Sequence, residues 1–235
     1  MTQLKPRRTV EAAGAAERER LLSLHHYEFA ARERGFRLIG GIDEVGRGPL
    51  AGPVVAACVV IEENLNLPGL DDSKRVPAKK REQLAAQITD QAASWAIGEA
   101  DVAEIDVHNI YQATLVAMKR ALDALAIAPQ YLIADAMHIH GFTGEQLALI
   151  KGDSLSATVA AASILAKVHR DRILAKLDAQ FPAYGFAHHK GYATPEHLAA
   201  LRRLGPCEHH RRSFAPVRAS LTDERSPVLF PLNIP

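Results

Sequence analysis

Apolar and polar positions follow two different periods along the chain. Two apolar, β-branched runs, Phe36–Ile42 and Val54–Ile61, flank the Gly- and Pro-containing stretch GRGPLAGP, which predicts two strands joined by a short connection. Shorter runs at 94–99, 131–135 and 147–151 predict three further strands. Apolar residues at helical spacing predict helices at 17–33, after Pro77, at 109–125, 156–181 and 195–204.

The order of these elements indicates the fold class. A pair of strands comes first, and strands alternate with helices afterwards, which is typical of a mixed α/β sheet. No internal repeat interrupts this order. The small residues of AAAS at 160–163 allow the helix at 156–181 to pack closely against the sheet. The stretch from Ala219 onward has three prolines and little periodicity, and we predict that it is an extended or mobile tail.

Length and composition narrow the class of protein. The chain has 235 residues, of which 48% are hydrophobic and 23% charged, enough for one fair-sized globular domain with a real core. No apolar window has the length of a transmembrane helix, and the N-terminus does not resemble a signal peptide. The two cysteines, Cys58 and Cys207, are far apart and suggest neither a disulfide framework nor a Cys-based metal site. We therefore expect a cytoplasmic protein with no membrane contact.

Basic residues gather in the C-terminal part of the chain. Although the net charge is only +1, residues 151–218 hold 11 Lys and Arg against 5 Asp and Glu, and this excess of six leaves the remainder at −5. Six of the 11 histidines lie in the same segment. A basic face of this kind suits a polyanion such as a nucleic acid, and a solvated basic surface is the alternative.

Carboxylates stand at the ends of three predicted strands. Asp43, Asp135 and Asp153 each end a strand or follow one, and Glu44 is next to Asp43. The carboxyl ends of parallel strands share one edge of a sheet, so these groups are expected to converge there. Carboxylates that lie together need a cation, and an oxygen-only ligand set selects Mg²⁺ or Mn²⁺. The alternative is that each Asp is a turn former or, for Asp153, a helix N-cap.

The chain resembles the ribonuclease HII family over residues 36–217. The resemblance is carried, in order along the chain, by the blocks GIDEVGRGPLAGPVVAA, DDSK, NIYQATLVAMKRA, YLIAD, KGDSLSATVAAASILAKVHRDR, YGFAHHKGYATPEH and HHRRSF. It implies a ribonuclease H-like fold, a five-stranded mixed sheet flanked by helices with a small helical C-terminal portion. The implied division is a charged leader (1–35), a catalytic core (36–180), a helical substrate-binding portion (181–218) and a Pro-rich tail (219–235).

The resemblance also assigns roles to individual residues. It implies that Asp43, Glu44, Asp135 and Asp153 are the catalytic ligands of Mg²⁺ or Mn²⁺. It implies that the backbone of the Gly46, Arg47, Gly48 turn senses a 2′-OH, which separates RNA from DNA. Tyr192 resembles a tyrosine that stacks on the sugar next to the scissile junction, and Lys74 a lysine that contacts phosphate. For Lys190, Arg211 and Arg212, phosphate contact and plain surface charge are both open.

The implied activity is endonucleolytic and uses two metal ions. The family cuts the RNA strand of RNA–DNA hybrids and the 5′ side of ribonucleotides embedded in duplex DNA, leaving 5′-phosphates. Rivals are ribonuclease HIII, a DNA nuclease of the same superfamily, and a binding module without catalysis. The 35-residue leader is short for the N-terminal domain of ribonuclease HIII, and four intact carboxylates disfavour a pure binding module. We expect a monomer.

Two smaller features remain. The histidine pairs at 188–189 and 209–210 fit no tetrahedral zinc set in their spacing. The tail segment SPVLF, Ser226–Phe230, faintly resembles peptides that bind bacterial sliding clamps, although the Gln of such peptides is absent. A sliding clamp contact through the tail is therefore one hypothesis, and simple packing or disorder is the other.

Overall fold

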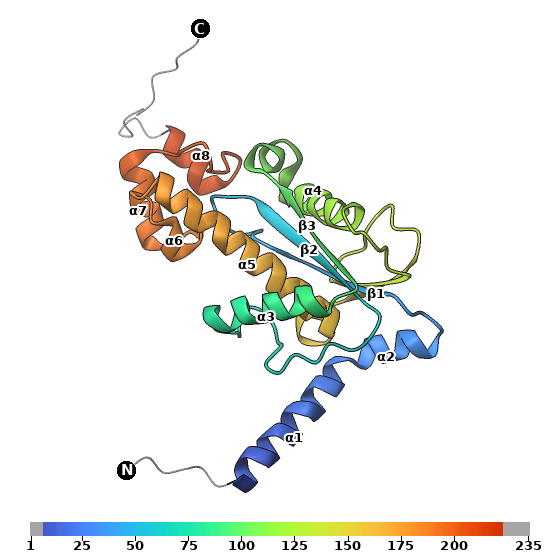
Figure 1. The fold of residues 1–235 in the computed structure, drawn as a ribbon. Coiled ribbons are helices and arrows are strands. Elements are labelled where there is room, and N and C mark those ends of the chain that lie inside the picture. The colour runs from blue at the N-terminus through green and yellow to red at the C-terminus, as the bar shows by residue number, and fades with distance from the viewer. Residues whose placement is uncertain (1–6, 223–235) are drawn as a thin grey trace, which may run out of the picture.

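A five-stranded mixed sheet forms the centre of the molecule (Figure 1). The computed structural model describes residues 7–222. The strand order is β3-β2-β1-β4-β5, with β1 antiparallel to β2, β2 antiparallel to β3, and β1, β4 and β5 mutually parallel. The strands are β1 (Ile39–Val45), β2 (Val54–Ile61), β3 (Ser94–Ala100), β4 (Tyr131–Asp135) and β5 (Glu145–Leu149). The predicted fold class is confirmed.

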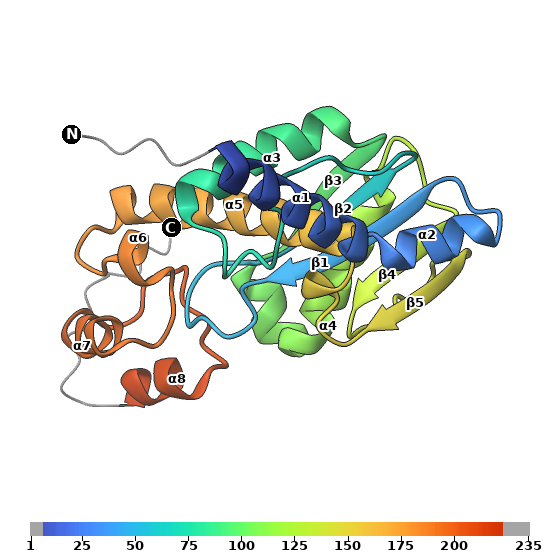
Figure 2. The same cartoon turned by 90° about the horizontal axis from the view of Figure 1, so that it is seen from below.

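Helices cover the sheet and extend from one of its ends. Those described are α1 (Arg7–Leu24), α2 (His26–Glu33), α3 (Ala78–Gln91), α4 (Val102–Asp123), the 3₁₀ turn η1 (Gly152–Ser154), α5 (Ala157–Gln180), α6 (Phe186–His189), α7 (Pro195–Leu204) and α8 (Ala215–Thr222). The views in Figures 1 and 2 both place α6, α7 and α8 together beyond one end of the sheet.

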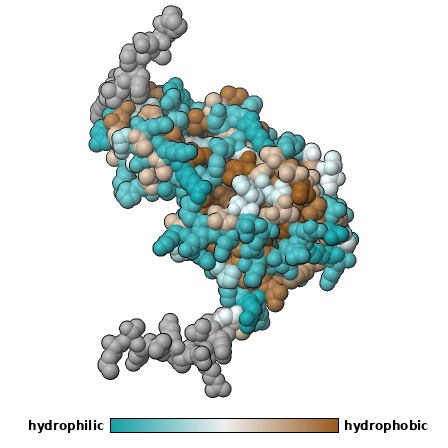
Figure 3. Space-filling model, in the orientation of Figure 1, coloured by the Kyte–Doolittle hydropathy of each residue, from teal (hydrophilic) through white to brown (hydrophobic). Residues whose placement is uncertain are grey.

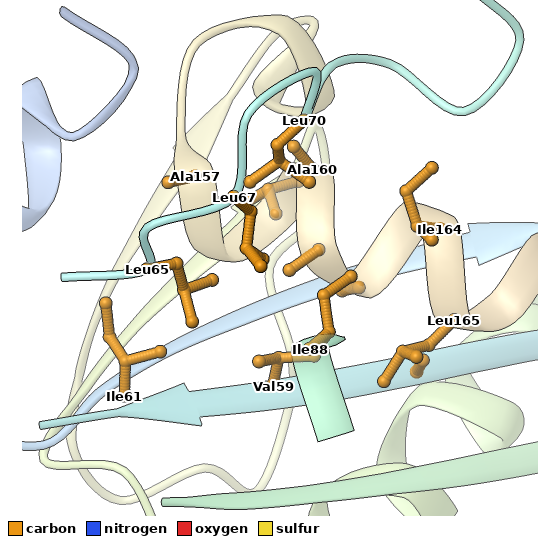
Figure 4. Packing of buried hydrophobic residues seen from close by; sticks show 14 of the residues in the cluster. Val59, Ile61, Leu65, Leu67, Leu70, Ile88, Ala157, Ala160, Ile164 and Leu165 are labelled. Atoms are coloured by element: carbon orange, nitrogen blue, oxygen red, sulfur yellow. The ribbon is translucent and has the colours of Figure 1, made fainter. Parts of the chain in front are cut away.

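Strand β2 is apolar throughout because helices pack on both faces of the sheet. Side chains of a strand alternate between faces, and Val55, Ala57, Val59 and Ile61 belong to the cluster that contains α3 and α5. Their neighbours in β2 belong to the cluster with α4 on the opposite face. Figure 4 shows the first cluster, in which Leu65, Leu67 and Leu70 of the loop after β2 lie against α5.

The long helix α5 lies directly on β1. Its N-cap is Ser156, whose hydroxyl accepts the N–H of Val159, and its first turns are built from small residues. A Cβ atom at Gly41 of β1 would lie only 2.2 Å from the carbonyl carbon of Thr158. A side chain at position 41 would therefore push the helix off the strand, and this contact holds α5 close to the residues that follow in β1.

The described part of the N-terminal segment packs on the same face. Leu21, Leu24 and Ala31 are buried in the cluster formed by α3 and α5. The side chain of Glu28 is fully buried, and its Oε1 accepts the Oγ of Ser156 (2.6 Å) together with the N–H (2.9 Å) and Oγ1 (2.8 Å) of Thr158. A carboxylate from α2 thus completes the N-terminus of α5, where negative charge is favourable.

The C-terminal helices are joined to the loop between β1 and β2. Ala51 packs with Leu174, Tyr184 and Phe186, and Leu50 packs with Leu201 and Val217. The loop backbone pairs with residues 209–211, through an Ala51–His210 bridge and N–H to carbonyl bonds in both directions. The stretch GRGPLAGP is therefore the junction between the sheet and α6–α8.

The structure differs from the sequence-based element bounds in several places. The helix predicted at 17–33 is divided into α1 (Arg7–Leu24) and α2 (His26–Glu33), and the strand predicted at 36–42 begins at Ile39 and ends at Val45 as β1. Helix α4 begins at Val102, not at Asn109, because Asp101 and Glu104 form a capping box; Asn109 (φ 68°, ψ 164°) then interrupts it. Strand β5 spans Glu145–Leu149, two residues earlier than predicted, because it pairs in parallel with β4 from Tyr131 onward. Residues 219–222 are helical as part of α8, and the rest of the predicted tail lies outside the described residues.

Hydrophilic residues cover most of the described surface in Figure 3. The few large apolar side chains that are exposed include Val107 and Tyr111 of α4. Among the described helices, none combines the length and the apolar character needed to cross a membrane.

Candidate active site

Strand register brings Asp43 and Asp135 together. Ile42 of β1 is paired with Ala134 of β4, so the aspartates that follow them stand side by side at the carboxyl ends of two parallel strands. The alternation of side chains directs both toward the α5 face, since Ile42 and Ala134 belong to the cluster on the α4 face. Glu44 comes next in β1 and points the other way. The strand pairing thus brings two of the four predicted carboxylates to one sheet edge, and the convergence of all four stays a prediction.

Asp43 sits in an electrostatically costly position. Its side chain is 5% exposed, and the hydroxyl of Ser163 on α5, which donates to the hydroxyl of Ser73 at 2.9 Å, lies near it. Burial, and next the negative charges of Glu44 and Asp135, raise the pKa of Asp43 well above its ordinary value, while Ser163 opposes the rise. A group held in this way gains from any cation that enters the site.

Only one of the two carboxylate oxygens of Glu44 has a hydrogen-bond partner, and that partner belongs to the turn that follows β1. Its Oε1 lies 3.2 Å from the guanidinium Nη1 of Arg47, three residues later. Its other oxygen, Oε2, is buried and has no hydrogen-bond partner among the described residues. Burial raises the pKa of Glu44, and Arg47 counteracts this. A buried oxygen without a donor is a costly feature that a metal ion would remedy.

The turn after β5 brings Asp153 to the same edge. Asp135 Oδ1 accepts the N–H of Gly152 at 2.7 Å, which ties the end of β4 to η1. Lys74 Nζ lies 3.7 Å from Asp153 Oδ2 and 4.0 Å from Asp72 Oδ1. Burial and then Asp72 raise the pKa of Asp153, and Lys74 lowers it. Partial burial would lower the pKa of Lys74, but the surrounding carboxylates raise it.

The donor set fits a hard divalent cation in chemistry. Asp43, Glu44 and Asp153 each have a pKa raised by burial, and Asp135 adds a fourth carboxylate whose charge acts on all three. All ligating atoms are oxygens, which suits Mg²⁺ or Mn²⁺. In the part of the chain that is described, however, no three His, Cys, Asp or Glu groups are gathered into a ready ligand cluster. The carboxylates share an edge without closing around one point.

The turn after β1 adopts a conformation that requires glycine at its first position, Gly46. Gly46 has φ 94°, and a Cβ there would lie 2.2 Å from Nε of Arg170. Gly48 has more room, since a Cβ would meet only the Tyr192 ring, at 3.7 Å. Tyr192, which is 44% exposed, therefore lies next to the glycine turn. The family resemblance implies a substrate contact for both.

The prediction that Arg211 lies at the surface, as a phosphate contact or a plain charge, is wrong. Its side chain is 0% exposed, and its guanidinium donates to the carbonyl oxygens of Gly46, Arg47 and Gly52. The basic run HHRRSF is read as surface in a sequence, but backbone pairing with the loop at 50–52 turns Arg211 inward. Arg212 keeps an exposed side chain, and its N–H donates to Asp106.

Lys190 is intermediate in exposure between the buried Arg211 and the exposed Arg212. It adopts a left-handed conformation (φ 53°), its carbonyl accepts from Arg170, and its side chain is partly exposed. It lines a depression of about 350 Å³ with other basic residues, namely Lys79, Arg81 and Arg172.

Three residues near the site were missed. Asp72 belongs to the block DDSK, where only Lys74 was selected, and its Oδ1 also accepts the N–H of Lys74. Ser163, in the run AAAS, lies near Asp43, and its hydroxyl donates to the hydroxyl of Ser73 at 2.9 Å. Arg170 is buried beside the glycine turn. The helical spacing of Asp43-facing positions on α5 could have indicated Ser163, but no sequence signal marks Arg170 as buried.

Comparison with known proteins gives a consistent result. The family model described as Ribonuclease HII matches residues 40–217. The chain is 54% identical over 206 residues to a ribonuclease HII of Geobacillus thermodenitrificans, covering 88% of this chain and 79% of the relative. A ribonuclease HII of Myxococcus xanthus is 50% identical over 215 residues, covering 91% and 73%.

Solved structures agree with the sequence relatives. The crystal structure of ribonuclease H2 from Pyrococcus horikoshii superposes with a TM-score of 0.67 at 27% identity, covering 78% of this chain and 96% of the other. A ribonuclease HII from Archaeoglobus fulgidus, solved in complex with PCNA, gives 0.55 at 26% identity, covering 70% and 85%. The extent of the match, together with the acidic edge and the glycine turn, leads to one conclusion: the chain belongs to the ribonuclease HII family.

Proposed function

We propose that this ribonuclease H enzyme hydrolyses the RNA strand of RNA–DNA hybrids and cuts on the 5′ side of single ribonucleotides embedded in duplex DNA. Membership of the ribonuclease HII family supports the first part. The observation that carries the proposal is the register of β1 and β4, which sets Asp43 beside Asp135. The buried, partnerless Oε2 of Glu44, the next residue of β1, supports it. The adjacent glycine turn supports the second part.

Mg²⁺ or Mn²⁺ would be held by Asp43, Glu44, Asp135 and Asp153. Bound divalent ions supply a nucleophilic water at neutral pH and stabilise the leaving 3′-oxygen of an in-line displacement. The N–H of Gly152 donates to Asp135 and fixes the orientation of that carboxylate. This contact holds one carboxylate in place before a cation arrives, which lowers the reorganisation needed for catalysis.

The remaining polar groups orient the substrate. Lys74 would bind a phosphate next to the acidic edge, and the 78% exposure of its side chain supports this role. The backbone of Gly46–Gly48 would meet the ribose 2′-OH and the ring of Tyr192 would stack on the neighbouring sugar, which the exposure of that ring beside Gly48 supports. Lys190 and Arg212 add charge for the duplex backbone at greater distance.

Three duplexes test the proposal. A duplex with one embedded ribonucleotide, a continuous RNA–DNA hybrid and an all-DNA duplex are incubated with the enzyme in Mg²⁺ and in Mn²⁺. We expect cleavage of the first two, with a 5′-phosphate at the ribonucleotide, and none of the third. Cleavage of the continuous hybrid alone would limit the activity to hybrids, and cleavage of the all-DNA duplex would overturn the proposal.

A sliding clamp contact is a second, separate proposal. The relative from Archaeoglobus fulgidus was solved with PCNA, which makes a clamp partner reasonable for this family. The segment proposed here, SPVLF at 226–230, lies outside the described residues. A pull-down with the bacterial clamp, comparing the full chain with a chain lacking residues 219–235, tests it. Equal retention of both chains would reject the tail as the contact.

A further inference from the structure

We propose that Arg211 and Arg170 are positioning residues that set the backbone of the glycine turn so that the amide N–H groups of Arg47 and Gly48 face the substrate. This inference rests on the proposed function, because it concerns how the same site recognises a ribonucleotide. It assigns a role to two side chains that touch neither metal nor nucleic acid.

The guanidinium groups of Arg211 and Arg170 donate their hydrogen bonds to main-chain carbonyl oxygens. Arg211 donates to Gly46 O (2.5 Å), Arg47 O (2.9 Å) and twice to Gly52 O (3.0 and 2.8 Å). Arg170 donates to the carbonyls of Pro53, Ala51 and Lys190, each at 3.0 Å. Both ends of the loop, and the residue two positions before Tyr192, are therefore held from inside the protein.

Burying these two charged groups costs desolvation free energy, which packing alone does not offset. Both side chains are 0% exposed, and neither guanidinium has a carboxylate within ion-pair distance in the described residues. Burial lowers the pKa of Arg170 to about 10 and of Arg211 to about 9, with Arg170 adding to the effect on Arg211. An apolar residue would fill such a space at lower cost. What arginine adds is a rigid fork of donors that fixes several carbonyls at once.

Fixing these carbonyls also fixes the amides. In a planar trans peptide the N–H points opposite to the C=O. Arg211 draws the carbonyls of Gly46 and Arg47 inward, so the N–H groups of the same two peptides, which belong to Arg47 and Gly48, point away from the buried guanidinium. Within the described residues, neither N–H has an acceptor. Two successive outward donors suit the 2′-oxygen and the adjacent phosphate oxygen of a ribonucleotide.

The neighbouring groups are consistent with a substrate on that side. Gly48 lies against the exposed Tyr192 ring, and Glu44 with its partnerless oxygen is four residues earlier in the chain. Arg170 bonds to the carbonyl of Lys190 and so couples the Tyr192 turn to the glycine turn. One pair of buried arginines thus sets both surfaces between which the ribose would lie.

Lysine substitutions test this idea. Arg211→Lys and Arg170→Lys keep the charge but replace the planar fork by one ammonium that cannot hold the same carbonyls. KM and kcat are measured on the duplex with one ribonucleotide, and the inhibition constant of an all-DNA duplex gives non-specific affinity. Arg37→Lys, on an exposed arginine before β1 that bonds to Glu62, is the matched control.

We expect each lysine variant to lose about tenfold or more of the preference for the ribonucleotide duplex, because a polar site that misses its partner discriminates poorly. The inhibition constant of the all-DNA duplex should stay within about twofold, since phosphate contacts are untouched. A folded Arg211→Lys variant with the wild-type preference would overturn the proposal. If the wild-type enzyme itself shows no preference, the proposed function fails and not only this inference.

A measurement on the wild-type enzyme covers the case in which the variants do not fold. The backbone amide resonances of Arg47 and Gly48 are followed by NMR while either duplex is added. Larger shifts with the ribonucleotide duplex than with the all-DNA duplex support outward-facing donors that read the ribose. Equal shifts with both duplexes refute them.

Discussion

The carboxylate of Asp135 accepts a hydrogen bond from the backbone N–H of Gly152 at 2.7 Å. This contact joins the last residue of β4 to Gly152, 17 residues later, in the turn that also carries Asp153. The two carboxylates therefore do not move independently, and a change at Asp135 acts on Asp153 as well. The choice of substitution at position 135 decides which effect is measured.

Asp135→Asn should separate charge from geometry. The amide oxygen of Asn can still accept from Gly152, so the turn is kept while the negative charge is lost. We expect cleavage to fall by about 10³-fold or more, as for loss of a charged group that acts in the transition state, with hybrid binding within a few-fold of wild type. Asp135→Ala also removes the acceptor for the N–H of Gly152, so it should in addition lower the free energy of unfolding of the substrate-free enzyme.

Asp90→Asn is the matched control for this prediction. Asp90 is exposed on α3, and the same change there should leave kcat and KM unaltered. Full activity of purified Asp135→Asn would remove Asp135 from the catalytic group.

Divalent cations should stabilise the fold as well as activate the enzyme. A ligand that binds only the folded state adds about 2.7 kcal/mol at 100 times its Kd, and 1 kcal/mol shifts Tm by roughly 2–4 °C in a chain of this size. We expect Mg²⁺ to raise Tm in the wild-type protein and EDTA to abolish both the rise and the cleavage. Glu44→Gln should need a higher Mg²⁺ concentration for the same rise. A Tm that ignores Mg²⁺ in wild type would contradict the assigned ligands.

Lys74 should contribute one phosphate contact. Its ammonium lies at the rim of the acidic edge, 3.7 Å from Asp153 and largely exposed. Removing one such contact lowers the slope of log Kd against log salt concentration by about 0.9 on duplex DNA. We expect this change for Lys74→Ala and none for Lys119→Ala, whose ammonium is paired with Asp123 on α4. An unchanged slope in Lys74→Ala would show that this lysine serves only the neighbouring carboxylates.

Acid should destabilise the C-terminal helices through two buried histidines. Burial, and next the charge of His197, lower the pKa of His210 from 6.5 to about 3, and burial also lowers the pKa of His197. The unfolded chain takes up these protons near pH 6.5, so the stabilising contribution is present above that pH and is lost as the pH falls.

At pH 5 the loss attributable to His210 alone is about 2 kcal/mol. Urea unfolding at pH 7.5 and pH 5.0 measures it. We expect His210→Gln to lose correspondingly less stability in acid than the wild-type protein. An equal loss in both would mean that His210 takes up its proton in the folded state, contrary to its burial.

Much of the site was predictable because strand ends are marked in the sequence. Asp43 follows the stretch IGGI and Asp135 the apolar run YLIA, and parallel strands deliver such positions to one edge whatever the length of the connection between them. The exact register, Ile42 with Ala134, depends on pairing across 92 residues and is visible only in three dimensions.

The environment of the arginines was not predictable in the same way. A basic run such as HHRRSF indicates a surface, because a lone guanidinium is seldom buried without a carboxylate. The partners of Arg211 are main-chain carbonyls. Every residue has such a group, so the sequence gives no sign of which ones an arginine will bind. For Asn109, likewise, the apolar spacing on either side is compatible with one continuous helix, and only the backbone conformation reveals the break.

The position of Glu28 matters for anyone who trims this protein. The family model matches from residue 40, and a chain shortened to that match would start after α2. Such a chain would retain every catalytic candidate yet leave Ser156 and Thr158 without the oxygen they share, at the foot of the helix that carries Ser163. We therefore expect an autonomous enzyme to need more of the chain than the family model covers, because the carboxylate of Glu28 belongs to α2.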